Sequence, residues 1–241
     1  MRAGVVSDST IPHPSKTRGR ERRLIRWQAI SGLVFATFLL LHLLNVMASA
    51  LGPGLYDALQ IRVRPLYQQP LVELTMVLGA LLVHVAAGVA RIRARPRSGS
   101  WGKLPLRTRL HRASACFLLV VIFGHFGATR LPSLLDGVWL GFAGVSFSME
   151  WMPGFFYPYY AALGLCGLYH GSYGAYLSLR ALGVRLPSIS TLGPRAWGPL
   201  VVAGALVVLG VLSFGGLLYA IDDPTTSDFA RFLAERLGVT P

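Results

Sequence analysis

Five long stretches of the chain contain no charged residue, and this pattern restricts the fold more than any other feature. The runs cover residues 27–56, 74–90, 113–129, 151–179 and 196–221. Each is close to or longer than the roughly 20 residues that a helix needs to cross about 30 Å of hydrocarbon. Of the 241 residues, 53% are hydrophobic and only 14% are charged, unlike a soluble protein. The sequence therefore predicts an all-α membrane protein with five transmembrane helices, at about residues 26–50, 70–91, 111–130, 156–180 and 197–221.

The segments outside this domain of residues 26–221 are predicted to be short or peripheral. Residues 1–25 form a polar, basic tail, in which His13 is most simply a solvated side chain. Residues 222–241 form a second tail, with a short amphipathic helix between Ser227 and Gly238. Residues 55–70 are expected to be an external loop with room for a short surface helix, and residues 137–149 an interfacial loop.

The basic residues predict the orientation in the membrane. Eighteen of the 23 Lys and Arg residues lie in residues 1–26, 91–112 and 180–195, which alternate with segments that contain few. By the positive-inside rule, the N-terminus is cytoplasmic and the C-terminus is outside, in a membrane of the bacterial cytoplasmic type. A protein that binds nucleic acid would be expected to have a soluble basic domain with interleaved aromatic residues, and the sequence predicts none. The net charge of +13 therefore favours binding to anionic lipid or to an acidic partner over binding to nucleic acid.

Four of the six histidines lie inside the predicted helices, where an imidazole that faced lipid would leave polar nitrogens unpaired. They are His42, His84, His125 and His170. The first and third predicted helices share a spacing, since Ser31 and Ser114 each precede a histidine by 11 residues. The histidines of the second pair of helices follow those of the first pair at offsets of 83 and 86 residues. We therefore predict an internal two-helix repeat.

Glycines near two of these histidines suggest what the helices bind. Gly88 follows His84 by four residues, and Gly174 follows His170 by four. A glycine one turn away on the same helix face leaves space for a large, flat group such as haem. We expect Ser31 and Ser114 to pack against haem in the same way.

The depth of each histidine predicts how they pair. At 1.5 Å per residue, His42 and His125 lie about 20 Å from the inner ends of their helices, and His84 and His170 about 10–15 Å. The first two are therefore predicted to be the axial iron ligands of an outer haem b, and the other two those of an inner haem b about 10 Å away. The chain has no C-x-x-C-H motif, so neither haem would be covalently attached.

The alternative for any single intramembrane histidine is a hydrogen bond between helices. A set of four, with one on each helix and matching depths, favours haem ligation. His111 differs because it lies at the predicted inner interface beside Arg112. A structural or lipid-facing role is favoured for it over a contact with quinone or a haem propionate.

The motif Leu110-His111-Arg112-Ala113-Ser114, followed by His125 and Thr129-Arg130, resembles the cytochrome b subunit of succinate dehydrogenase and fumarate reductase, in its five-helix, di-haem (type B) form. The similarity extends over most of the chain. It implies the haem ligand pairs predicted above from depth, and a flavoprotein subunit that carries FAD and an iron-sulfur subunit docked on the cytoplasmic face. Trp27-Gln28 stands where several relatives carry a histidine.

Charged residues near the predicted haems are further candidates. Glu73 precedes His84 by 11 residues, which places it on nearly the same helix face and level with the outer haem. It is a candidate for proton transfer linked to quinone chemistry, or else a solvated acid at the interface. Four arginines are candidates for contacts with the propionates, with snorkelling to lipid headgroups as the alternative. They are Arg91, Arg93, Arg130 and Arg180.

The sequence thus predicts the di-haem membrane anchor of a succinate:quinone oxidoreductase, which carries electrons to or from menaquinone or ubiquinone and has no succinate site of its own. One alternative is a haem b subunit of another quinone-linked complex, of the hydrogenase or formate dehydrogenase type. A second alternative is a histidine-containing transporter without haem.

Overall fold

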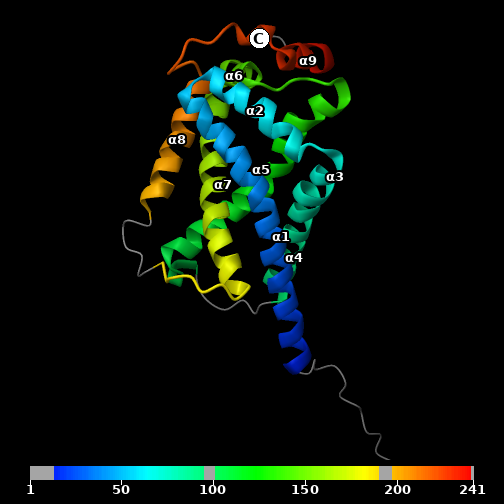
Figure 1. Ribbon diagram of the computed structural model, residues 1–241, viewed down its shortest axis with the longest axis vertical. Coiled ribbons are helices and arrows are strands. Elements are labelled where there is room, and N and C mark those ends of the chain that lie inside the picture. Colours follow the sequence, from blue (N-terminus) through cyan, green and yellow to red (C-terminus); the bar gives the residue numbers. More distant parts are fainter. Residues whose placement is uncertain (1–13, 95–100, 190–196, 240–241) are drawn as a thin grey trace, which may run out of the picture.

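The computed structural model describes residues 14–94, 101–189 and 197–239, and every regular element among them is helical (Figure 1). Residues 1–13 of the predicted tail, with His13 among them, lie outside the described residues. The elements are α1 (Pro14–Ala48), η1 (Ser49–Leu51), α2 (Pro53–Tyr67), α3 (Pro70–Val72), the π-helix η2 (Glu73–Gly79), α4 (Ala80–Ala94), η3 (Trp101–Lys103), α5 (Leu106–Asp136), α6 (Phe142–Trp151), α7 (Pro153–Ala181), α8 (Gly198–Phe214), η5 (Pro224–Thr226) and α9 (Asp228–Leu237).

In the part of the chain that the structure describes, three helical stretches are long and apolar enough to cross a membrane. They are Arg18–Leu51, Pro70–Ala94 and Leu106–Asp136. Helix α8 is apolar but shorter, and α7 has 29 residues but carries six tyrosines and five glycines. The prediction of an all-helical chain with membrane-spanning helices is confirmed to this extent.

Helix α1 is the centre of the bundle, since α4, α7 and α8 all pack against it, while α5 packs against α7 (Figure 1). Small residues allow close packing of helices where lipid provides no hydrophobic driving force. At Gly210 of α8, an added Cβ atom would lie 2.5 Å from the Ser49 hydroxyl and 2.7 Å from the carbonyl oxygen of Val46. A side chain at this position would therefore push α8 away from the end of α1.

Helices α2, α6 and α9 lie across one end of the bundle and form what we call the cap (Figure 1). Two buried apolar clusters hold the cap together. One contains Tyr56, Phe142, Met149, Val211 and Phe214, and the other contains Val138, Leu140, Phe147, Phe229 and Ala230. Helix α9 begins with the Ser227 hydroxyl accepting a hydrogen bond from the amide of Ala230 and ends at Gly238 with φ +63°, as the sequence predicted.

The prediction of an interfacial loop over residues 137–149 is wrong, because residues 142–151 form α6. Its N-cap residue is Gly141, which has no side chain to accept a hydrogen bond from the first turn. Instead the carboxylate of Asp57, from α2, accepts a hydrogen bond from the amide of Phe142 at 2.9 Å. Because the residue that caps this helix lies 85 positions away in the sequence, the sequence near α6 contains no signal for the start of the helix.

Several helix ends differ from the predicted positions. Helix α1 begins at Pro14, about 12 residues before the predicted start, because the Arg-rich residues that follow are good helix formers and proline is favoured in a first turn. Helix α5 continues through Pro132 to Asp136 and ends at Gly137 with φ +66°. Helix α8 ends at Phe214, seven residues earlier than predicted, because Gly216 takes φ +73°.

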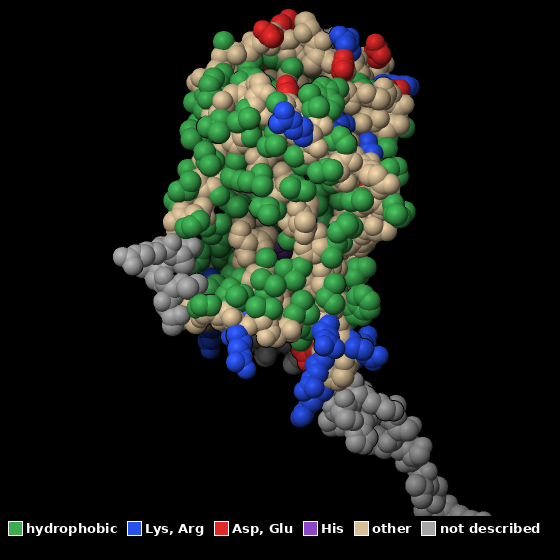
Figure 2. All heavy atoms as spheres, viewed as in Figure 1, with side chains coloured by type: hydrophobic (Ala, Val, Ile, Leu, Met, Phe, Trp, Pro, Cys, Tyr) green, Lys and Arg blue, Asp and Glu red, His purple; other side chains and the backbone are tan. Residues whose placement is uncertain are grey.

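Charge is divided between the two ends of the bundle. Acidic side chains gather at the cap together with some Arg side chains, whereas Lys and Arg side chains predominate at the opposite end (Figure 2). Among the described residues, Glu21 is the only acid that lies at the end opposite the cap. The asymmetry matches the alternation of basic segments along the sequence.

The bond between Asp57 and Phe142 can be tested with two variants. We expect Asp57→Ala to lower the free energy of unfolding by about 1 kcal/mol, the usual effect of removing a helix cap. Burial raises the pKa of Asp57, so the charged form destabilises the fold as the pH rises through that pKa. Asp57→Asn keeps an acceptor without the charge, so it should be at least as stable as the wild type at neutral pH. Thermal unfolding in detergent measures both, and equal stability of the two variants would contradict this role.

Candidate cofactor site

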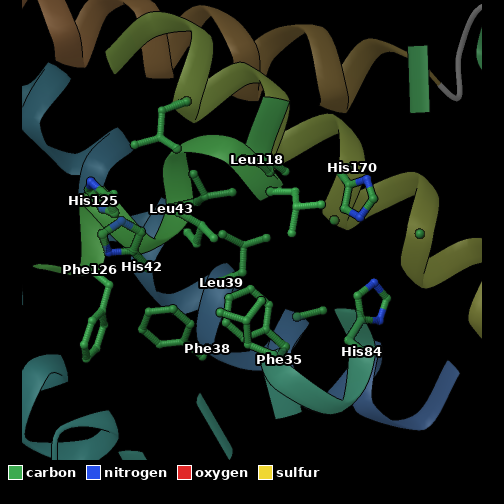
Figure 3. Close-up of a pocket in the computed structure, with 18 of the residues that line it drawn as sticks. Phe35, Phe38, Leu39, His42, Leu43, His84, Leu118, His125, Phe126 and His170 are labelled. Atoms are coloured by element: carbon green, nitrogen blue, oxygen red, sulfur yellow. The ribbon is translucent and has the colours of Figure 1, made fainter. Parts of the chain in front are cut away.

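A large cavity of about 2040 Å³ runs through the bundle and is lined by residues of α1, α4, α5, α7 and the cap (Figure 3). Cavities for a single small ligand usually measure about 300–1,000 Å³, so this one has room for more than one large group. Aromatic and aliphatic side chains make up much of its wall, among them Phe35, Phe38, Leu39 and Leu43 of α1.

The four predicted histidines all point into this cavity and meet in two pairs (Figure 3). The ring centres of His42 on α1 and His125 on α5 are 6.1 Å apart. Those of His84 on α4 and His170 on α7 are 6.2 Å apart. Each pair therefore joins two helices that are far apart in the sequence, and the pairs are those expected from depth.

The spacing of both pairs fits a metal bound between the rings. Two imidazoles on opposite sides of one metal, each with its nitrogen about 2 Å from it, have ring centres about 6 Å apart. Haem iron needs only two such axial ligands, because the macrocycle supplies the others. The described residues contain no group of three or more His, Cys, Asp or Glu suited to a metal held by side chains alone.

The pair that contains His84 and His170 also has the outer hydrogen bonds that metal-binding histidines usually make. The Nδ1–H of His84 donates to the carbonyl oxygen of Gln28 at 3.0 Å, and that of His170 donates to the carbonyl oxygen of His111 at 3.4 Å. A carbonyl oxygen can only accept, so both rings carry the proton on Nδ1 and keep the lone pair of Nε2 for a ligand.

Gly32 makes room for the His84 ring, which sequence analysis did not foresee. A Cβ atom at Gly32 would lie 2.7 Å from Nδ1 of His84. Because His84 lies level with Gln28 and Gly32 on α1, it is about 15–21 Å from His42 along that helix.

The two serines and two glycines that were predicted to pack against haem have protein groups as neighbours. The hydroxyls of Ser31 and Ser114 bond to carbonyl oxygens of their own helices, and neither residue lines the cavity. Gly88 and Gly174 line it, but a Cβ atom at Gly88 would lie 3.0 Å from the side-chain nitrogen of Gln28, and one at Gly174 would lie 3.5 Å from the His111 ring. These two glycines thus make room for protein side chains.

His111 lies in the cavity wall, so of the structural or lipid-facing role predicted for it, the lipid-facing alternative is wrong. Its ring stacks on that of His170, with centres 4.3 Å apart and planes at 5°. The Nδ1 atom of His111 is buried and has no hydrogen-bond partner. The stacked ring helps to fix the orientation of His170 and adds a third imidazole at this end of the cavity.

Two of the four predicted arginines line the cavity and two do not. Arg91 and Arg130 line it, and Arg91 donates to the side-chain oxygen of Gln28. Arg93 and Arg180 are exposed and lie outside the lining, and Arg180 donates to the Tyr176 hydroxyl at 3.2 Å. Cavity-lining arginines that were not predicted are Arg22, Arg26 and Arg112 at the end opposite the cap and Arg64 at the cap.

Glu73 and Arg130, which sequence analysis assigned to separate roles, form an ion pair. The Nε and Nη2 atoms of Arg130 donate to the two carboxylate oxygens of Glu73 at 2.5 and 2.6 Å. The two side chains are only 14% and 13% exposed, respectively. The pair lies at the cap end of the cavity, about one turn beyond His125 on α5.

Comparisons with known proteins add no assignment, since no family model, no curated protein and no solved structure matches this chain. The candidate site therefore rests on its own geometry.

The role of Gly32 can be tested by adding one methyl group. Gly32→Ala should displace the His84 ring from the Gln28 carbonyl. If the two pairs bind haem, as the sequence predicts, the variant should lose the haem between His84 and His170 and keep the one at the other pair. The matched control is Gly124→Ala, because an added Cβ atom there meets nothing within 4 Å. Haem bound per chain measures the effect, and full haem content in Gly32→Ala would contradict it.

Proposed function

We propose that the chain is the di-haem b membrane subunit of a succinate:quinone oxidoreductase. The observation that carries the proposal is that four histidines from four helices form two pairs in one cavity, each with the spacing of two axial ligands. His42 and His125 hold the haem nearer the cap, and His84 and His170 hold the other. Each haem, when bound, supplies a one-electron redox centre between the docked soluble subunits and quinone in the membrane.

The membrane arrangement belongs to the same proposal. Helices α7 and α8 pack on α1 within the bundle and complete five spans with the three long apolar stretches. The end opposite the cap is basic and faces the cytoplasm, so the cap faces outward, in a bacterial-type cytoplasmic membrane. The N-terminal residues of α1 extend beyond the bundle at the basic end, where they offer exposed arginines to an acidic partner (Figures 1 and 2).

The side chains around each haem site have distinct tasks in this proposal. The carbonyls of Gln28 and His111 fix the tautomers of His84 and His170, so that the lone pair of each Nε2 would be available to hold the iron. Arginines that line the basic end, with Arg91 among them, provide positive charge for propionates. At the cap end, the ion pair between Glu73 and Arg130 places a carboxylate and a guanidinium beside the space available to quinone.

Co-purification tests which complex the chain belongs to. Mild-detergent purification from the native membrane should recover an FAD-containing flavoprotein and an iron-sulfur subunit, with quinone-linked succinate oxidation. Hydrogenase or formate dehydrogenase subunits in their place would contradict the assignment and favour that alternative. A colourless protein without redox partners would favour the transporter.

Single substitutions test the two haem sites separately. His84→Ala and His170→Ala should each remove the same one of two haems, and His42→Ala and His125→Ala should each remove the other. His111→Phe is the control, because it keeps a stacked ring at a position that holds no iron. Reduced-minus-oxidised spectra and haem counts measure the outcome. Loss of both haems in His111→Phe, or of none in His84→Ala, would contradict the ligand assignment.

Glu73→Gln tests the proton-transfer role of this residue. If the carboxyl exchanges protons with quinone, the variant should lower quinone turnover by about tenfold or more and flatten its pH dependence. Arg130→Gln tests the pair, because removing either partner leaves the other charge poorly compensated. Normal turnover with a normal pH profile in Glu73→Gln would leave the carboxylate with only a structural role.

A further inference from the structure

Three imidazoles come together at the end of the cavity opposite the cap, although a haem iron between helices needs only two. The ring of His170 on α7 meets that of His84 almost at a right angle, with planes at 86° and centres 6.2 Å apart. The same ring lies nearly parallel to that of His111 on α5, with planes at 5° and centres 4.3 Å apart. Rings stacked at this distance touch, so no iron fits between them. His111 therefore contacts His170 without forming a third pair of ligands.

The hydrogen bond of His170 does not define the plane of its ring. Its Nδ1–H donates to the carbonyl oxygen of His111 at 3.4 Å, whereas the bond from His84 to the Gln28 carbonyl is 3.0 Å long. Most N–H···O bonds are about 2.9–3.0 Å long, and longer ones are weaker. The torsion that rotates a histidine ring about its Cβ–Cγ bond also has broad minima. The flat face of His111 therefore supplies the constraint on ring rotation that this bond lacks.

The His111 ring is itself held in place by packing. Its Nδ1 atom is buried and has no hydrogen-bond partner in the described part of the chain, so no bond at this atom sets the position of the ring. The Tyr173 ring packs edge-on against it, with centres 5.2 Å apart and planes at 84°. The Tyr169 hydroxyl donates to the carbonyl oxygen of Arg107 at 3.0 Å, which joins α7 to α5 about one turn before His111. These contacts keep His111 and His170 at the same level.

The other histidine pair has a different neighbour. The rings of His42 and His125 meet at 63°, and the ring that stacks on His42 is that of Phe38, with centres 5.7 Å apart and planes at 16°. Among the described residues, His111 is the only histidine outside the two pairs whose ring contacts a member of either pair. The closer and more nearly parallel stack therefore belongs to the pair at the basic end.

The angle between two axial imidazoles affects the electronic state of an iron between them. Each ring interacts through its π system with the iron d orbital that matches its plane, so parallel rings act on one orbital and perpendicular rings act on two. Perpendicular rings leave these orbitals close in energy, which raises the reduction potential relative to parallel rings and increases the highest g value of the ferric electron paramagnetic resonance (EPR) spectrum. Surroundings that hold a ligand ring in one plane therefore tune the metal. Because 86° is close to a right angle, almost any rotation of the His170 ring would lower the angle.

We propose that His111 is a positioning residue, whose ring fixes the plane of the His170 imidazole and so keeps the two axial ligands of this haem nearly perpendicular. This inference rests on the proposed function and deepens it, because it assigns a residue that regulates one of the two redox centres. Through the angle between His84 and His170, His111 raises the reduction potential of the haem at the basic end. It does not hold the iron itself.

Two substitutions at His111 separate the flat ring from the rest of the side chain. His111→Leu fills much of the space without a flat face, whereas His111→Phe keeps a flat ring. Both remove the ring nitrogens, and both keep the backbone carbonyl that accepts from His170. A difference between the two variants therefore reports the stacked ring alone.

EPR spectra and redox titrations of the haem-loaded complex, purified in mild detergent, measure the effect. We expect two haems per chain in both variants. His111→Leu should lower the highest g value of one of the two ferric low-spin signals and lower the midpoint potential of the same haem. His111→Phe should keep both signals and both potentials close to those of the wild type. His84→Ala identifies the affected signal, because this variant should lack the haem at this pair.

The outcomes separate this inference from the proposed function. A two-haem His111→Leu complex with the EPR signals and potentials of the wild type would overturn the inference and leave the haem assignment intact. Equal changes in His111→Leu and His111→Phe, including loss of this haem from both, would also overturn it, because the ring nitrogens and not the stack would then matter. Loss of this haem from His111→Leu alone would support it, since the flat ring would then be needed to hold His170. Absence of haem from the wild-type chain would instead overturn the proposed function.

Discussion

An imidazole inside an apolar helix bundle has two ring nitrogens, and each needs a partner because neither water nor lipid supplies one there. In the pair formed by His84 and His170, backbone carbonyls of Gln28 and His111 bind the Nδ1 side of each ring. The other nitrogen faces the cavity and the opposite ring, 6.2 Å away from centre to centre. A group that occupies this gap would satisfy both rings at once. The helices around the cavity are thus packed so that their polar groups meet there.

The cavity can remain open because helices meet closely elsewhere. Small residues bring α8 against the end of α1, and Gly32 gives the His84 ring its place beside α1. At one end the cap covers the cavity with α2, α6 and α9, and residues of α9 such as Phe229 form part of its wall. The cap also brings in the polar side chains of α2, which a bundle of simple apolar spans would lack. The two histidine pairs and the polar side chains at the cap therefore come from different parts of the chain.

Much of this arrangement could be predicted from the sequence, because periodic and repeated features leave local signals. The apolar runs predicted the helical membrane fold, and counting residues from the helix ends predicted which histidines meet. The sequence could not predict α6, since the side chain that caps its first turn belongs to Asp57 of α2. Nor could it predict that Glu73 and Arg130 form a pair, because they are 57 residues apart and each also had a plausible role alone. Gln28, Gly32 and Gln60 matter through contacts with other segments, which depend on rotation and level rather than on composition.

Whether the two histidine pairs hold two b-type haems is tested most directly by the haem content of the purified wild-type chain. The dithionite-reduced minus oxidised spectrum would be recorded in detergent, and extracted haem would be counted per polypeptide. We expect b-type spectra and two non-covalent haems per chain, each with two axial imidazoles. A well-folded chain without haem would contradict this assignment.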